Sequence, residues 1–230
     1  MKILTVVSYF PMPQDHGDAL RRLMVLQALQ QDNALTVSAA YRTTTTDADV
    51  VALKSALPRA RVLVGELAPI AGPSLVAKLK RTALGPLRAT PPWIFQHWSP
   101  SLADALGALD DQFDAVVLVG EGSGLYASMV AGPHIVWDKS NVLVASDLST
   151  LRSQESIAAR LRALVTIGLT KSFEKRILRR ADVVWVTTAE EDERLARHYA
   201  RRADAIIPSC VPLPAGPGVQ LDPAGVTSLG

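Results

Sequence analysis

Short apolar segments alternate with amphipathic ones along most of the chain. The apolar segments are rich in Val, Ile and Leu, which favours strands at residues 3–8, 34–41, 60–67, 114–120, 134–138, 182–188 and 203–208. Segments with helical periodicity follow them, and helices are predicted at residues 18–31, 46–57, 123–131, 155–180 and 189–202. Because alternating strands and helices form right-handed βαβ units, the sequence predicts an α/β fold: a doubly wound, Rossmann-like domain with a mostly parallel sheet of about seven strands.

The C-terminal tail has a different composition. From Val211 onward, prolines and glycines are frequent, and these residues continue neither a helix nor a central strand. We therefore expect the Rossmann-like domain over residues 1–212. We expect a linker over residues 213–230 that leads to the first strand of a further domain.

Composition restricts the class of protein. The chain has 230 residues, of which 48% are hydrophobic and 20% charged, a balance typical of a globular protein. The single cysteine, Cys210, excludes an internal disulfide framework and indicates a reducing compartment. No apolar stretch approaches the length of about 18 residues that a transmembrane helix needs. We expect a cytoplasmic protein.

The charge is small overall but unevenly spread. A net charge of +2 does not favour a nucleic-acid partner. Cationic residues gather in two segments: Lys78, Lys80, Arg81 and Arg88 in one, and Lys171, Lys175, Arg176, Arg179 and Arg180 in the other. Each segment is either a solvated helix face or a surface that attracts an anionic phospholipid or a diphosphate-bearing substrate. Membrane contact is therefore expected to be at most peripheral, at the inner face.

Ligands of open α/β sheets bind beyond the carboxyl ends of the strands, which selects the predicted loops 9–18, 41–46, 120–124 and 138–150. In the first loop, Gly17 allows the backbone to approach a ligand, and His16 is a further polar candidate. Asp18 is placed to cap the helix, whose start favours an anion, and Arg21 lies one turn further on. A plain loop with a capped helix explains the same residues equally well.

Two further loops carry polar candidates. The segment GEGSG places Glu121 and Ser123 after a strand, where Glu121 is suited to sugar hydroxyls or to a surface role. The segment WDKSN places four polar residues directly after a buried strand, and this favours a binding site: Asp138, Lys139, Ser140 and Asn141.

Several other chemistries lack their motifs. The four histidines show no metal-ligand spacing, so no metal is predicted; His97 and His198 are assigned to the surface, and His134 to a structural role. A phosphate-binding G-x-x-x-x-G-K-[ST] loop and a G-x-S-x-G elbow are both absent from the sequence. The first βα turn holds one glycine, which argues against an oxidoreductase that uses a nicotinamide or flavin cofactor.

Taken together, these segments resemble the N-terminal domain of the GT-B glycosyltransferases, in particular the large retaining family known as family four. The opening is similar to that family's P-x-x-x-G-x-x-x-R loop, with Pro13, Gly17 and Arg21 at the same spacing. The stretch IVWDKSNVLVASDLSTLR resembles the family's D-x-H-N-V-E…R stretch, FEKRILRRADVVWVTT its E-x-R helix and following strand, and IIPSCVP its PNGVD segment. The resemblance covers about residues 1–214. The sequence departs from the family pattern at three places. Ser140 and Leu143 change the acceptor side, and the segment SCVP changes the hinge before the second domain.

The resemblance implies a metal-independent transfer of a hexose from a nucleotide-diphosphate-sugar to an acceptor hydroxyl on a saccharide or a lipid-linked molecule, with no other cofactor. The loop with His16, Gly17, Asp18 and Arg21 would lie on the donor phosphate side. The acceptor or sugar would contact a second group: Glu121, Ser123, Asp138, Lys139 and Asn141. The basic segment 78–88 and Trp93 would receive a lipid-linked or polyanionic acceptor.

Family members carry a second Rossmann-like domain that binds the nucleotide-sugar, so the resemblance also implies a separate C-terminal partner domain and a chain that is inactive alone. The alternative is a non-catalytic binding module that keeps the fold. The departures at Ser140 and Leu143 favour this alternative.

Overall fold

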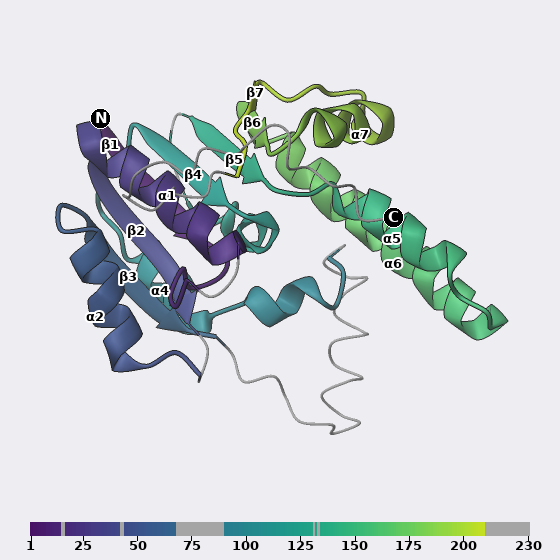
Figure 1. The fold of residues 1–230 in the computed structure, drawn as a ribbon, viewed down its shortest axis with the longest axis horizontal. Helices are drawn as coiled ribbons and strands as arrows, with labels where there is room; N and C mark the ends of the chain where they lie inside the picture. The colour runs from purple at the N-terminus through teal and green to yellow at the C-terminus, as the bar shows by residue number, and fades with distance from the viewer. Residues whose placement is uncertain (15–16, 42–43, 68–89, 131, 133, 210–230) are drawn as a thin grey trace, which may run out of the picture.

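The computed structural model describes residues 1–14, 17–41, 44–67, 90–130, 132 and 134–209. Its centre is a seven-stranded sheet in which every neighbouring pair is parallel, in the order β3-β2-β1-β4-β5-β6-β7 (Figure 1). The strands are β1 (Lys2–Val7), β2 (Ala34–Tyr41), β3 (Arg61–Glu66), β4 (Ala115–Val119), β5 (Ile135–Lys139), β6 (Val183–Val186) and β7 (Ala205–Ile206). The order reverses between β1 and β4, so the predicted doubly wound α/β fold is confirmed.

The helices occupy both faces of the sheet. They are α1 (Gly17–Asp32), α2 (Asp47–Ala56), α4 (Pro100–Gly107), α5 (Leu143–Arg152), α6 (Ile157–Leu178) and α7 (Ala189–Tyr199), with two 3₁₀ helices, η1 (Ile94–His97) and η2 (Glu121–Tyr126). Two of these helices begin after a capping threonine that can be recognised in the sequence. Thr46 forms a capping box with Asp49 at α2, and Thr188 accepts a hydrogen bond from the Glu191 amide at α7.

The alternation of side chains along β1 builds two hydrophobic cores. Ile3 and Val7 point to the face covered by α1 and α2, whereas Leu4 and Val6 point to the opposite face. The larger core on that opposite face also holds buried residues of α4, α6 and α7. Because β1 and β4 are buried on both faces, they read as continuous apolar runs in the sequence.

Two predicted elements differ from the structure. The helix predicted at residues 123–131 is the 3₁₀ helix η2, because Gly122 and Gly124 weaken an α-helix and admit His97 and Ile177 at close range. The loop predicted at residues 138–150 contains α5 from Leu143 onward. Its N-cap, Val142, forms no side-chain cap, so no local signal marks where this helix begins.

A hairpin of two packed helices extends away from the sheet. Figure 1 shows α5 and α6 side by side in green, reaching beyond the edge formed by β6 and β7. The Oγ1 of Thr170 on α6 donates to the carboxylate of Asp147 on α5, at 2.6 Å, and fixes the two helices together. Among the helices of the described residues, none is both long and apolar enough to cross a membrane.

Candidate functional site

The carboxyl ends of β1, β4 and β5 meet at one edge of the sheet. The turn after β4 begins with Gly120 at a φ of 80°, a conformation that favours glycine. A Cβ at Gly120 would lie 2.7 Å from the Oγ of Ser8, so a larger residue here would have to displace the Ser8 side chain. The hydroxyl of Ser123 is buried and donates to the carbonyl of Gly120 at 2.5 Å, which assigns this predicted site residue to holding the turn.

A buried ion pair joins α1 to the end of β5. The Nη2 of Arg21 lies 2.5 Å from the Oδ1 of Asp138, and the two side chains are 4% and 1% exposed. Burial raises the pKa of Asp138 to about 6, although Arg21 opposes the shift. The Nε of Arg21 is buried and has no hydrogen-bond partner among the described residues. The sequence left open whether Arg21 faces the site or solvent, and the structure places it inside, against Asp138.

Beside this ion pair, Arg22 links the start of α1 to the end of β1. Its Nη2 lies 3.1 Å from the Oδ2 of Asp18, and its guanidinium carbon lies 4.8 Å from the centroid of the Tyr9 ring. The Tyr9 ring in turn packs edge-on against His97, at 4.3 Å between centroids. The prediction that His97 lies at the surface is wrong, because Gly122 leaves room for the imidazole inside.

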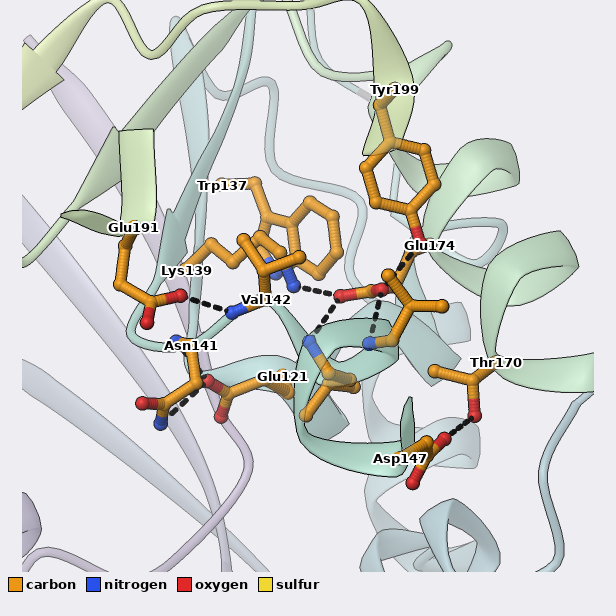
Figure 2. Close-up of polar contacts among 12 residues, drawn as sticks. Glu121, Trp137, Lys139, Asn141, Val142, Asp147, Thr170, Glu174, Glu191 and Tyr199 are labelled. Atoms are coloured by element: carbon orange, nitrogen blue, oxygen red, sulfur yellow. Dashed lines mark hydrogen bonds and ion pairs between the residues drawn. The ribbon is translucent and has the colours of Figure 1, made fainter. Parts of the chain in front are cut away.

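Lys139 lies inside the protein and not at the site surface. Its side chain is fully buried and forms an ion pair with Glu174 of α6 (Figure 2). Glu174 also accepts hydrogen bonds from the hydroxyl of Tyr199 at 2.5 Å and from the amides of Leu143 and Val144 at 3.0 and 3.1 Å. The side chain of Lys139 therefore neutralises a buried carboxylate that holds the first turn of α5.

Two more carboxylates complete the start of α5. The Oε2 of Glu191 accepts from the amide of Val142 at 2.6 Å. The Oε1 of Glu121 accepts from the amide of Asn141 at 2.7 Å and from its side-chain Nδ2 at 3.4 Å (Figure 2). Negative groups are favourable at a helix N-terminus, and here the protein supplies them itself. An external phosphate would find these amides already occupied.

A cavity of about 750 Å³ opens beside this helix start, between α5 and α7. Its polar lining includes Asn141, Ser146, Ser149, Arg152, Arg194, Arg197 and His198. Arg194 is held by ion pairs with Glu190 and Glu191. Asn141 is exposed, and its side-chain oxygen Oδ1, which accepts no hydrogen bond from the described residues, is available to a ligand in this cavity.

The start of α1 is open in comparison. A Cβ at Gly17 would meet no atom of the described residues within 4 Å, and the residue is exposed. Asp18 is the second residue of α1 and lies in its first turn, so it does not occupy the capping position that the sequence predicts for it. His16 and segment 78–88 lie outside the described residues, and Trp93 is half-buried at the start of η1.

Three side chains organise this edge, Glu174, Glu191 and Tyr199, and none was among the predicted site residues, although Glu174 is the first residue of the E-x-R segment. A signal for Glu174 exists, because it falls on the stripe of α6 that also contains Phe173 and Ile177 in the core. A carboxylate on a buried helical stripe needs a cationic partner. Among the described residues, no cluster of three or more His, Cys, Asp or Glu side chains is arranged to hold a metal ion.

No protein-family model matches the sequence, and no curated protein is significantly similar to it. Two solved structures align with most of this chain. The first is UGT71G1 of Medicago truncatula complexed with UDP-glucose, with a TM-score of 0.54 and 13% sequence identity over 97% of this chain and 54% of that one. The second is LpCGTa in complex with UDP, with a TM-score of 0.45 and 16% identity over 91% of this chain and 51% of that one.

The likeness to UGT71G1 establishes a shared fold. That fold is a Rossmann-like domain with a parallel sheet, which agrees with the fold implied by the sequence resemblance. The chain spans about half the length of both solved chains.

Proposed function

We propose that this chain is the N-terminal, acceptor-side half of a GT-B glycosyltransferase. The reaction transfers a hexose from a nucleotide-diphosphate-sugar to an acceptor hydroxyl. The bond between the sugar carbon and the diphosphate breaks as the bond to the acceptor oxygen forms. The family-four relationship, with retention of configuration and without a metal, belongs to the same proposal. A second α/β domain supplies most of the nucleotide contacts.

The observation that carries this proposal is the open start of α1 at the carboxyl edge of the sheet, the edge at which ligands of open α/β sheets bind. Gly17 is exposed there, and no atom of the described residues lies within 4 Å of a Cβ added to it. The Glu121–Asn141 pair, which joins the ends of β4 and β5, stands at the same edge. The fold shared with UGT71G1, whose structure contains UDP-glucose, supports the choice of ligand.

The residues divide into two roles. Gly17 and the start of α1 approach the donor phosphates or the transferring sugar, where the backbone amides of Gly17 and Asp18 stabilise the charge of the leaving diphosphate. Asn141, on the wall of the large cavity, binds a hydroxyl of the acceptor or sugar, with Glu121 fixing its amide. Arg21, Asp138 and Lys139 act by positioning these elements, since all three are buried in ion pairs.

Replacing Gly17 by tryptophan tests the proposal. The chain is combined with the α/β polypeptide encoded by a continuing or adjoining reading frame. UDP-glucose is then titrated calorimetrically, and its turnover to UDP is followed. Because an open space receives the new ring, Gly17→Trp leaves the fold intact and lowers kcat/KM by tenfold or more, a loss of about 1.4 kcal/mol of transition-state binding.

Two variants control for this result. Gly17→Ala adds only a methyl group and retains turnover. Gly107→Trp places the same ring at another exposed glycine, at the end of α4, where the described residues again leave open space. Unchanged turnover in Gly17→Trp would remove the first turn of α1 from the donor site.

One observation favours the second candidate, a binding module without catalysis. Among the predicted acceptor-side residues, Ser123, Asp138 and Lys139 are all buried in contacts within the chain. In that case sugars bind beside Asn141, and no turnover appears with any partner domain. Calorimetric binding of UDP-glucose or a saccharide that Asn141→Ala abolishes, without UDP release, would distinguish this function from transfer.

A further inference from the structure

The outer half of α6 exposes an apolar stripe. Ile157, Leu161, Leu164 and Val165 are each more than half exposed, at 77%, 59%, 52% and 60%. Their spacing of four, three and one residues places them on one side of the helix. The helix end that carries them lies on the part of the α5–α6 hairpin farthest from the sheet (Figure 1). Large apolar side chains gathered in this way mark an interaction surface.

The same side of α6 becomes cationic toward the sheet. Lys171, Lys175 and Arg179 follow Ile157 by 14, 18 and 22 residues, close to whole turns of an α-helix, so they continue the apolar stripe in line. All three are exposed, and none forms an ion pair with an acidic side chain in the part of the chain that the structure describes. One helix face thus carries apolar side chains at its outer end and uncompensated positive charge at its inner end.

Helix α7 extends the cationic part across a cavity of about 440 Å³. The described residues that line it include no acidic side chain: Lys171, Lys175, Leu178, Arg179, Arg197, His198, Tyr199, Ala200 and Arg201. Burial lowers the pKa of His198, and the nearby charges of Arg197 and Lys171 lower it further. Arg201 is engaged with the carbonyls of Leu178 and Ala181, which leaves the other cations available to an anionic partner.

We propose that this surface, the outward face of α6 together with Arg197 of α7, docks on an anionic phospholipid membrane. The apolar end enters the boundary between headgroups and acyl chains, while the lysines and arginines lie at the level of the lipid phosphates. A protein partner would account for the apolar stripe alone. The aligned run of unpaired cations fits a continuous anionic layer better, because charge complementarity then extends along the inner end of the helix while the apolar stripe enters the layer. The proposal uses no residue of the α1 site, and among the cations named for docking only Arg197 also lines the cavity beside Asn141.

Vesicle co-sedimentation of the 230-residue chain tests the docking surface. The chain binds vesicles of phosphatidylcholine mixed with phosphatidylglycerol, binds those of phosphatidylcholine alone far less, and is released by added salt. The double variant Lys175→Glu/Arg179→Glu lowers the vesicle partition coefficient by roughly fivefold or more for each charge replaced. The variant Leu161→Glu/Leu164→Glu also loses binding.

Matched changes on α2 serve as controls. Val51 is 61% exposed and Lys54 is exposed, so Val51→Glu and Lys54→Glu make the same chemical changes on a different helix. Both controls bind as the unmodified chain does, and all variants keep its thermal unfolding curve.

Three results would overturn the proposal. The first is no sedimentation with phosphatidylglycerol vesicles, and the second is equal binding to neutral vesicles. The third is a dimer in sedimentation velocity that Leu161→Glu dissociates, because the stripe would then cover a second copy of the chain.

Discussion

Two helices begin at the same edge of the sheet and differ in what occupies their first turn. At α5, the carboxylates of Glu121, Glu174 and Glu191 accept the amides of residues 141–144, so the positive end of the helix is neutralised from within the protein. At α1, no carboxylate from another element accepts the amide of Gly17 or Asp18 in the parts of the chain that the structure describes. The same local physics therefore serves stability at α5, whereas the amides of Gly17 and Asp18 at α1 have no such carboxylate among the described residues.

The difference also explains why several polar residues that the sequence predicts for a binding site instead hold the two helices in place. Lys139 compensates the charge of Glu174 beneath α5, and this pair is fully buried. Arg21 and Asp138 hold α1 against the strand end. A charged side chain can bind either a ligand or an oppositely charged side chain of the same protein. When that internal partner is buried, its charge must be compensated, and the residue serves the fold instead of a ligand.

The largest effect is expected from Glu174→Ala, which opens the closed helix start. The substitution removes the acceptor of two amides and the tyrosine hydroxyl, and it leaves Lys139 as an uncompensated buried charge. We expect a loss of about 3–5 kcal/mol in the free energy of unfolding, measured by urea denaturation. Glu190→Ala, which removes an exposed carboxylate paired with Arg194, changes it by only about 0.5 kcal/mol. A small effect at Glu174 would mean that the carboxylate does not close α5.

A somewhat smaller effect is expected from pH at the ion pair of α1. Burial raises the pKa of Asp138 to about 6 from the ordinary 3.8, so the native state binds more protons than the unfolded state between these values. The contribution of Asp138 to stability therefore falls as pH rises from about 4 to about 6, by an amount of the order of 3 kcal/mol. Urea denaturation over this range shows the decline in the unmodified chain.

The variant Asp138→Asn isolates that contribution. It removes the titrating group, so the decline appears in the difference between the two chains at each pH. Parallel pH profiles for the two would contradict the raised pKa.

A modest effect is expected at the turn between the two helix starts. Gly120→Ala introduces a Cβ at a φ of 80° and 2.7 Å from the Oγ of Ser8. We expect a loss of about 1–2 kcal/mol from backbone strain, with more if Ser8 cannot move. Gly168→Ala, inside α6 with open space around it, instead stabilises the chain by about 0.5–1 kcal/mol. Thermal unfolding distinguishes the two, and equal shifts would argue against the close approach of the strand ends.

The sheet could be predicted because its signal is local. Runs such as residues 114–120 are rich in Val and Leu, and each predicted strand overlaps an observed one. The start of α5 could not be predicted, since the groups that hold it come from Glu174 and Glu191, at least 30 residues further along the chain. For the same reason, the sequence identified Asn141 and Glu121 as polar candidates but did not show that they pair.

The most direct test compares the two helix starts in one experiment. The amide signals of the ¹⁵N-labelled chain are followed by NMR during titration with UDP-glucose, which detects binding even at a dissociation constant of about 1 mM. We expect shifts at Gly17 and Asp18 and none at Leu143 and Val144, whose amides donate to Glu174. Shifts at Leu143 and Val144 without any at Gly17 and Asp18, or no shift at either helix start, would contradict the assignment of the open start of α1 to the donor.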